Sequence, residues 1–386
     1  MQDLFISDDA SLAALTGTLS ASRWLAVDTE FVRERTYFPE PCLLQLANEN
    51  TVACVDLLAV SELDPLVALL TDPDIVKVFH DASQDLELLY RLIGSVPTPI
   101  FDTQVAATLL GHGDQVGYAA LAKDMLDVDL DKSHSRTDWR QRPLTDAQIQ
   151  YAGDDVRYLR EIYRRQYQTL HELNRLDWLE ADFTAATDPN RYRPDPDNVW
   201  KRLKRMHTLK GAQLAVAREL AAWREREAIE SNQPRRWVLA DDALLDMARR
   251  GPNSEADLKR IRGLNHAQID RCGESWLACI RRGRETPREE WPKPDIRIRL
   301  DPSQEALVDA AMAIVKLCGH EHSVSPGSLA SKRELEALVA GQSNDSPLLN
   351  GWRHQIVGSS IERFLGGKTC LSVRNGHLVQ RPINLE

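Results

Sequence analysis

The segment WLAVDTEFVRERTYFPE, residues 24–40, places two carboxylates at the end of an apolar run. A short apolar run bounded by a turn predicts a buried strand, here beginning at Trp24. Residues two apart on a strand point to the same face, so Asp28 and Glu30 are expected side by side. Two like charges about 4 Å apart repel by about 4 kcal/mol at an effective dielectric near 20. We therefore expect a group nearby that offsets this repulsion.

The first half of the chain predicts an α/β domain, a mixed sheet flanked by helices. The strand that carries Asp28 is followed by short apolar runs, and the first three strands are expected to form an antiparallel meander. Helical apolar spacing appears between and after the strands. The predicted strands cover 43–47, 51–57 and 75–80, and the predicted helices cover 62–70, 83–93, 102–110, 117–126 and 145–170.

Two proline-containing segments, 185–200 and 284–295, predict linkers. Each is followed by an apolar helix, a polar turn with a proline and a second helix, which indicates two small all-α domains. The predicted domains are therefore an α/β domain and two helical ones, at 1–198, 199–290 and 296–378.

Charge is distributed unevenly along the 386 residues, whose net charge is −10. Residues 1–199 carry −17, residues 200–284 carry +8 and residues 285–386 carry −1. An acidic first half followed by a basic module favours a division between chemistry and polyanion binding. The alternative is a solvated basic helix surface.

The six cysteines are scattered and include no C-x-x-C pair. This pattern disfavours a zinc site or a disulfide framework and favours a reducing cytoplasm. The first residues lack the basic start and apolar core of a secretory signal. No apolar stretch approaches the roughly 18 residues of a membrane helix.

Three further residues extend the acidic pattern of Asp28 and Glu30. Asp85 lies on the helix predicted after a buried strand, and Tyr151 and Asp155 are four apart on one helix face. Each feature alone is common on protein surfaces. Together they predict a site for hard divalent cations such as Mg²⁺ or Mn²⁺, which prefer oxygen ligands. Two such cations about 3.5–4 Å apart can clamp an in-line phosphoryl transfer.

The motifs VDTEF, HDASQD and YAGDD resemble those of DEDD-type 3′→5′ exonucleases of RNase H-like fold, in the subclass with tyrosine in the third motif. Within that subclass the chain resembles the ribonuclease D family over nearly its whole length. The two helical repeats resemble HRDC domains, the second more loosely. The resemblance implies an exoribonuclease that uses two divalent cations and releases nucleoside 5′-monophosphates in the 3′ maturation of tRNA precursors and other small RNAs. It further implies a cytoplasmic monomer with no nucleotide cofactor and no membrane partner.

The resemblance also implies a role for each motif residue. Asp28 would bridge both cations, Glu30 and Asp155 would complete the first site, and Asp85 would serve the second. Tyr151 would contact the attacking water. A phenol with a reference pKa near 10 is a poor base at neutral pH, so we expect Tyr151 mainly to orient that water.

Several other residues have a substrate role and a structural role as open alternatives. His80, Gln45, Trp139 and Arg142 are candidate substrate contacts, each with a core or anchoring role as the alternative. Trp237 either stacks on a base or fills the core of its helical module. The candidate RNA-binding basic patch comprises Lys201, Arg202, Lys204, Arg205, Arg235 and Arg236.

Three other function classes are alternatives to an exoribonuclease. A DNA exonuclease would carry the same acidic cluster, and an inactive RNA-binding protein would not need it. A helicase is disfavoured, because the GGKT at 366–369 has Glu362 where a phosphate-binding loop requires glycine.

Overall fold

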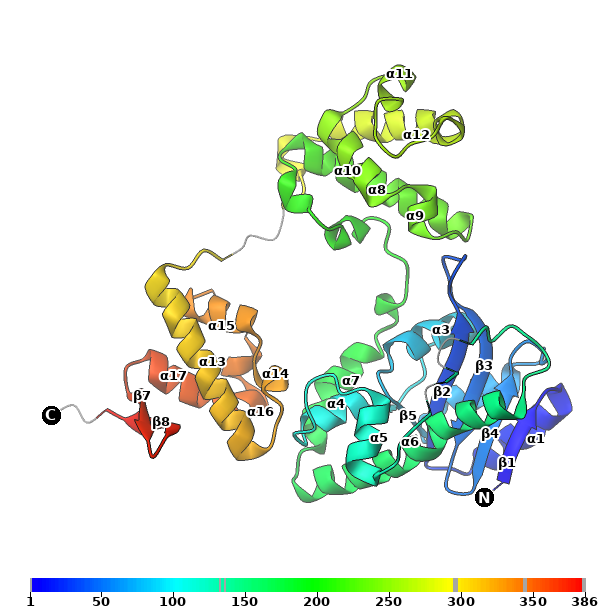
Figure 1. Cartoon of the computed structure of the whole chain (residues 1–386), viewed down its shortest axis with the longest axis vertical. Helices are drawn as coiled ribbons and strands as arrows, with labels where there is room; N and C mark the ends of the chain where they lie inside the picture. Colours follow the sequence, from blue (N-terminus) through cyan, green and yellow to red (C-terminus); the bar gives the residue numbers. More distant parts are fainter. Residues whose placement is uncertain (1, 132, 135–136, 294–297, 343–345, 384–386) are drawn as a thin grey trace. The chain divides into compact units, whose positions relative to one another are not determined.

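The computed structural model describes residues 2–131, 133–134, 137–293, 298–342 and 346–383 (Figure 1). The chain forms two compact units. Unit 1 comprises residues 1–31, 41–192 and 298–386, and unit 2 comprises residues 32–40 and 193–297. The predicted domain boundaries stay predictions.

Unit 1 contains a six-stranded mixed sheet with the strand order β1-β4-β3-β2-β5-β6. Strands β3 and β4 are antiparallel, as the predicted meander requires. The pairs β1–β4, β2–β5 and β5–β6 are parallel, so the carboxyl ends of β2 and β5 lie at the same edge. The strands are β1 (Gln2–Ile6), β2 (Trp24–Val32), β3 (Glu40–Ala47), β4 (Thr51–Asp56), β5 (Val76–Phe79) and β6 (Ile100–Asp102).

Helices cover both faces of this sheet (Figure 1). Leu25 and Val27 of β2 pack with α1 (Asp9–Leu19), α2 (Asp64–Thr71) and α3 (Ser83–Ile93). Ala26, between them, packs with α6 (Asp146–Glu172) on the other face. Helices α4 (Thr103–Thr108) and α5 (Tyr118–Leu126) contact α6. Alternation along β2 therefore directs Asp28 and Glu30 to the α6 face.

Three of these elements were not predicted from the sequence: β1, α1 and β6. The predicted helix 102–110 begins one residue later, after β6, and Asp102 caps it by accepting hydrogen bonds from the amides of Gln104 and Val105. The predicted helices 83–93 and 117–126 lie at α3 and α5.

The last part of unit 1 begins with α13 (Pro302–His322) and packs on the α/β domain. The Ser325 amide donates to the Thr108 carbonyl oxygen at 2.7 Å, and the Trp178 and Trp352 rings stack with centroids 4.6 Å apart. A hairpin of β7 (Thr369–Arg374) and β8 (His377–Pro382) ends this module, so the all-helical prediction for 296–378 is wrong from residue 369 on. Its other helices are α14 (Pro326–Leu329), α15 (Lys332–Val339), α16 (Gly351–Arg353) and α17 (Ser359–Leu365), with a π-helical turn at His354–Gly358.

Unit 2 is a helical module whose main helices, α8 (Ala212–Glu230) and α12 (His266–Glu285), pack on each other. Trp276 is fully buried in its core. The remaining elements are α9 (Arg235–Val238), α10 (Asp241–Arg250), α11 (Glu255–Leu258) and short 3₁₀ turns at Val199–Arg202, Met206–Thr208 and Arg288–Glu290.

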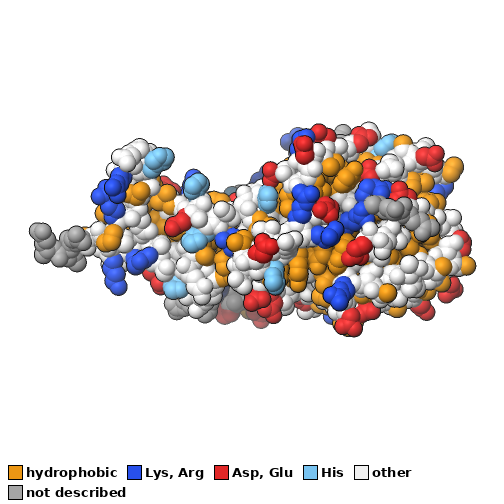
Figure 2. All heavy atoms as spheres, turned by 90° about the horizontal axis from the view of Figure 1, so that it is seen from below, with side chains coloured by type: hydrophobic (Ala, Val, Ile, Leu, Met, Phe, Trp, Pro, Cys, Tyr) orange, Lys and Arg blue, Asp and Glu red, His pale blue; other side chains and the backbone are white. Residues whose placement is uncertain are grey.

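Two properties of the whole chain bear on the sequence predictions. Acidic and basic side chains are interspersed on the face in Figure 2, so the acidic balance of residues 1–199 does not form one continuous acidic surface there. None of the helices in the described part of the chain has the length and hydropathy needed to cross a bilayer.

Candidate active site

The candidate site lies at the carboxyl ends of β2 and β5. Residues Trp24–Ala26 pair with Val76–Val78, and Asp28 and Glu30 follow on β2 beyond that pairing. Ligands of open α/β sheets bind outside the carboxyl ends of the parallel strands. The site therefore occupies the edge at which chemistry is expected in such a sheet.

Helix α6 supplies the third carboxylate. A capping box of Thr145 and Gln148 begins the helix, which places Tyr151 and Asp155 one turn apart on one face. Among the described residues, Asp28, Glu30 and Asp155 offer carboxylate oxygens that all lie within 4.8 Å of one another. The neighbouring Asp154 instead accepts from Arg157 Nε at 2.8 Å. Only the second aspartate of YAGDD therefore belongs to the cluster.

Asp85 is buried on α3, next to this cluster and outside the 4.8 Å group. Its carboxylate accepts a hydrogen bond from the Thr29 hydroxyl at 2.5 Å. Burial raises the pKa of Asp85 well above its usual value, and the charge of Asp28 raises it further. The structure thus brings all four predicted carboxylates to one end of the sheet, and three of them offer oxygens within 4.8 Å of one another.

The electrostatics of the cluster call for a cation. Burial raises the pKa of Asp28 to about 7 and that of Asp155 to about 9. Burial and then the charge of Asp28 raise the pKa of Glu30 to about 9. These groups cannot all ionise near neutral pH without a compensating positive charge. A set of carboxylate oxygens with this need fits a hard divalent cation.

Tyr151 borders the cluster with its phenol. Burial and the charge of Asp155 raise the pKa of Tyr151, so the phenol stays protonated at neutral pH. Its ring lies 5.7 Å from that of His134 and 6.2 Å from that of Trp139, centroid to centroid. The Tyr151 ring thus packs between two aromatic neighbours, on the helix that carries Asp155.

Two of the four candidate substrate residues, His80 and Trp139, have surroundings that favour a structural role. The ring nitrogens of His80 hydrogen-bond with Thr103 Oγ1 at 2.9 Å and the Val116 carbonyl oxygen at 3.0 Å. Trp139 is 2% exposed. The hydrogen bonds of His80 and the burial of Trp139 favour a structural role over a substrate contact for both residues.

Gln45 on β3 is fully buried. Its neighbours Leu44 and Leu46 pack toward α1–α3, so alternation directs Gln45 to the face of α6 and the carboxylates. Among the described residues, neither its amide oxygen nor its amide nitrogen has a hydrogen-bond partner. Both readings of Gln45, core amide and substrate contact, stay open.

All five N–H groups of Arg142 donate hydrogen bonds within unit 1. Its Nε and Nη2 donate to the two carboxylate oxygens of Asp56, each at 2.6 Å. The remaining N–H groups donate to the carbonyl oxygens of Trp139, Gln141 and Cys42 at 2.7, 2.9 and 3.1 Å. A guanidinium has five donors. This geometry favours an anchoring role over a phosphate contact.

Three residues that support the site were not singled out from the sequence. Thr29 donates to Asp85, Tyr118 donates its hydroxyl to the Asp155 carbonyl oxygen at 2.5 Å, and Asp102 accepts from the amides of Asp81 and Ala82. Asp102 thereby holds the turn that leads into α3. The only available signals were the position of Thr29 between two motif residues and the strand-to-helix step at FDTQ.

Comparison with known proteins agrees with this geometry. A family model described as 3′-5′ exonuclease matches residues 4–168, and the HRDC domain model matches residues 213–280. The chain is 39% identical to ribonuclease D of Gluconacetobacter diazotrophicus over 98% of its own length and 96% of that protein. The chain belongs to the ribonuclease D family. Ribonuclease D of a Jannaschia species is 40% identical over 96% of this chain and 97% of that one.

A solved ribonuclease D extends the agreement to the fold. The crystal structure of Escherichia coli RNase D, described as an exoribonuclease involved in structured RNA processing, matches with a TM-score of 0.82 at 31% identity. The match covers 95% of this chain and 99% of that one. The predicted α/β exonuclease domain followed by an HRDC domain is thus confirmed, and this ribonuclease D family member is a nuclease. The HRDC character of the second helical module stays a prediction.

Proposed function

We propose that the protein is a 3′→5′ exoribonuclease that removes nucleotides singly and releases nucleoside 5′-monophosphates. The observation that carries this proposal is the convergence of the Asp28, Glu30 and Asp155 carboxylates. Tyr151 lies one helical turn before Asp155 on α6. Membership of the ribonuclease D family favours RNA as the polymer. Precursors of tRNA and other small RNAs with 3′ extensions are the proposed substrates, and the cytoplasm and a monomer are the proposed location and state.

Asp28, Glu30 and Asp155 would hold one divalent cation, and Asp85, with Asp28, would serve a second. Mg²⁺ or Mn²⁺ bound there would acidify the attacking water and neutralise charge on the phosphate. The raised pKa values of these carboxyl groups support this assignment, because burial otherwise favours their protonated forms.

The phenol of Tyr151 would orient the attacking water by donating or accepting a hydrogen bond. Its raised pKa makes proton removal by a phenolate unfavourable near neutral pH. Tyr118 would fix this part of α6, since its hydroxyl bonds to the Asp155 carbonyl oxygen. Thr29 would hold Asp85 in one orientation through its hydroxyl.

A degradation assay with end-labelled RNA tests this function. With 3′-labelled RNA in Mg²⁺ or Mn²⁺, the first product should be labelled mononucleotide, and 5′-labelled RNA should shorten stepwise. Internal cleavage would contradict the proposal, and so would the absence of mononucleotide. DNA of the same sequence should be a poorer substrate; equal or faster hydrolysis would indicate a DNA exonuclease, and binding without hydrolysis an inactive RNA-binding protein.

Substitutions at neighbouring positions separate the proposed roles. Asp155→Asn should remove nearly all activity, because a cation ligand loses its charge, and Asp154→Asn is the matched control one residue away. Tyr151→Phe should reduce kcat less than Asp155→Asn does, because only the orientation of the water is lost. Equal losses would favour Tyr151 as a base.

A further inference from the structure

The amide of Gln45 is a buried polar group without a hydrogen-bond partner among the described residues. Gln45 lies on β3 and is 0% exposed, and in that part of the chain neither its Oε1 nor its Nε2 is paired. The amide offers two N–H donors and a carbonyl acceptor, and an unpaired polar group in a buried position destabilises a fold. Such a group in a native structure therefore calls for a specific explanation.

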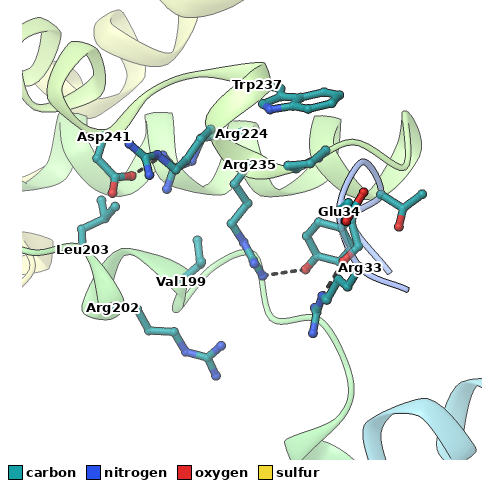
Figure 3. Close-up of a pocket in the computed structure, with 13 residues that line it drawn as sticks. Arg33, Glu34, Val199, Arg202, Leu203, Arg224, Arg235, Trp237 and Asp241 are labelled. Carbon is teal, nitrogen blue, oxygen red and sulfur yellow. Dashed lines mark hydrogen bonds and ion pairs between the residues drawn. The ribbon is translucent and has the colours of Figure 1, made fainter. Parts of the chain in front are cut away.

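Two buried polar side chains elsewhere show the usual pairing. Gln166 of α6, also 0% exposed, donates from Nε2 to the Thr103 carbonyl oxygen at 3.1 Å, and of its two polar atoms only Oε1 is unpaired in the described part of the chain. In unit 2, Arg235 lines a cavity of about 500 Å³ (Figure 3), and its Nε donates to the buried Glu225 carboxylate at 2.5 Å. Gln45 differs from both in having two unpaired polar atoms.

The pairing of β3 with β4 shows which groups surround Gln45. Gln45 lies opposite Cys54 in the antiparallel register, and the side chains of opposite residues share a face. The Cys54 thiol donates to the Ile149 carbonyl oxygen of α6 at 3.8 Å. Burial raises the pKa of the Cys54 thiol to about 12, and the charges of Asp155 and Asp28 are among the smaller causes. Gln45 therefore lies under α6, beside a residue within electrostatic reach of two cluster carboxylates.

The neighbour of β3 on its other side is β2, the strand that carries Asp28. Only residues 33–39 connect β2 to β3, too few for the crossover that a parallel pair requires, so the two strands are antiparallel. Ala26 and Ala47 belong to the same core under α6. Two residues onward from Ala26 and two residues back from Ala47 lead in the same direction, to Asp28 and Gln45. This arrangement directs the Gln45 amide toward the Asp28 carboxylate.

We propose that Gln45 positions Asp28 for cation binding, by donating from Nε2 through one buried water to the Asp28 carboxylate. Carboxylates that bind metal ions in proteins are themselves held by further hydrogen bonds. Buried waters pair with polar groups that lack a protein partner. A neutral amide suits this role, because it orients the carboxylate without adding a positive charge that would compete with the cation. The inference rests on the proposed cation site and deepens it.

Binding of Mn²⁺ in the absence of RNA tests this role. Gln45→Met keeps the length of the side chain and removes its amide. The dissociation constant of Mn²⁺ is measured by electron paramagnetic resonance, in which the sharp signal of the free ion is lost on binding. Gln45→Met should raise this constant by about tenfold or more, as loss of a hydrogen bond to a metal ligand does. Gln45→Leu repeats the measurement with a side chain of different shape, should Gln45→Met fold poorly.

Thermal melts in EDTA, with Gln166→Met as the matched control, separate this role from a core role. The melting temperature of Gln45→Met should stay within about 1 °C of the wild type or rise, because the protein fold loses no hydrogen bond. Gln166→Met loses its bond to Thr103, so its melting temperature should fall by about 2 °C or more while its Mn²⁺ affinity is unchanged. A Mn²⁺ dissociation constant of Gln45→Met within about twofold of the wild type would overturn the inference. A fall in its melting temperature equal to that of the control would do so too.

Kinetics at saturating Mn²⁺ address the substrate alternative. The KM of Gln45→Met for RNA should return to the wild-type value there, because the cation site is refilled. A KM that stays raised, with unchanged Mn²⁺ affinity, would overturn the inference and assign Gln45 to the substrate.

This inference and the proposed function fail in different ways. A wild-type chain that binds Mn²⁺ through Asp28 but releases no mononucleotide would refute the exoribonuclease, and a loss of Mn²⁺ affinity in Gln45→Met would still support the role of Gln45. A chain that degrades RNA while Gln45→Met binds Mn²⁺ as tightly as the wild type would refute only that role. Equal Mn²⁺ affinity of the wild type and Asp28→Asn would refute both.

Discussion

Replacing Arg142 by methionine should destabilise unit 1. The carboxylate of Asp56, with a side chain 5% exposed, would lose both hydrogen bonds from Arg142 Nε and Nη2, each 2.6 Å long. Removing one partner of a buried ion pair costs about 3–5 kcal/mol. Because the Arg142 side chain is 25% exposed, we expect the lower end, about 3 kcal/mol. Three carbonyl oxygens also lose donors to which water has partial access.

Thermal unfolding of the full chain measures this effect. For a domain of this size, 1 kcal/mol shifts the melting temperature by about 2–4 °C, so Arg142→Met should lower it by about 6–12 °C. Arg142→Lys should recover only part, since an ammonium has three donors in place of five. The control is Arg140→Met, whose Nε pairs with Asp138 at 2.9 Å on the surface and contributes about 1 kcal/mol or less.

The competing role of Arg142 predicts a different result. If its guanidinium bound phosphate, Arg142→Met would leave the melting temperature within about 1 °C of the wild type while raising the KM for RNA about tenfold, as loss of a charge-assisted hydrogen bond does. That outcome would refute the anchoring role. A double variant with Asp56→Leu should regain part of the lost stability, because no buried charge is left unpaired.

Three further predictions concern the cation site, the sheet and the thiols. Mg²⁺ or Mn²⁺ at a hundredfold its Kd should stabilise the wild-type chain by about 2.7 kcal/mol in thermal melts and should fail to stabilise Asp28→Asn; equal shifts would contradict the site. Lys77→Met should lower the midpoint of urea unfolding by an amount equivalent to about 2–4 kcal/mol of unfolding free energy, because the buried Nζ donates to three carbonyl oxygens at 2.6–2.7 Å. An unchanged midpoint would exclude a stabilising role of these three hydrogen bonds. Iodoacetamide at pH 8 should label the exposed Cys370 and spare Cys54, because burial raises the pKa of the Cys54 thiol to about 12. Peptide mass spectrometry measures the labelling of both sites, and rapid labelling of Cys54 would contradict its burial.

Local patterns predicted the elements that carry the site. The run before Asp85 becomes β5, and the helical spacing at 83–93 matches α3, which ends at Ile93 and is capped by Gly94 with φ +76°. In both cases the periodicity of apolar residues agrees with a turn signal at the boundary, so the local sequence indicates the element.

Elements that depend on distant partners escaped prediction. Strand β1 has only five residues, and its pairing with β4 joins segments some 50 residues apart. Strand β6 has three residues and depends on the neighbouring β5. Propensity over so few residues carries little information, because tertiary pairing decides whether such a segment is a strand.

The same reasoning applies to individual side chains. The engagement of Arg142 depends on Asp56 and Cys42, which are 86 and 100 residues away in the sequence. Which tryptophan enters the helical core, Trp276 rather than Trp237, is likewise decided by packing. Residue type indicated the chemistry of which these groups are capable, and the fold determined which of them remain available for it.

The stacked indoles of Trp178 and Trp352, with ring planes 1° apart, have a practical consequence for shortening this chain. A version ending before α13 would uncover Trp178 and the apolar surface around it, which the last module normally shields. Newly exposed apolar surface of this kind promotes aggregation. Poor turnover by such a truncated enzyme would then report on its colloidal behaviour, and would say little about how the missing segment handles substrate.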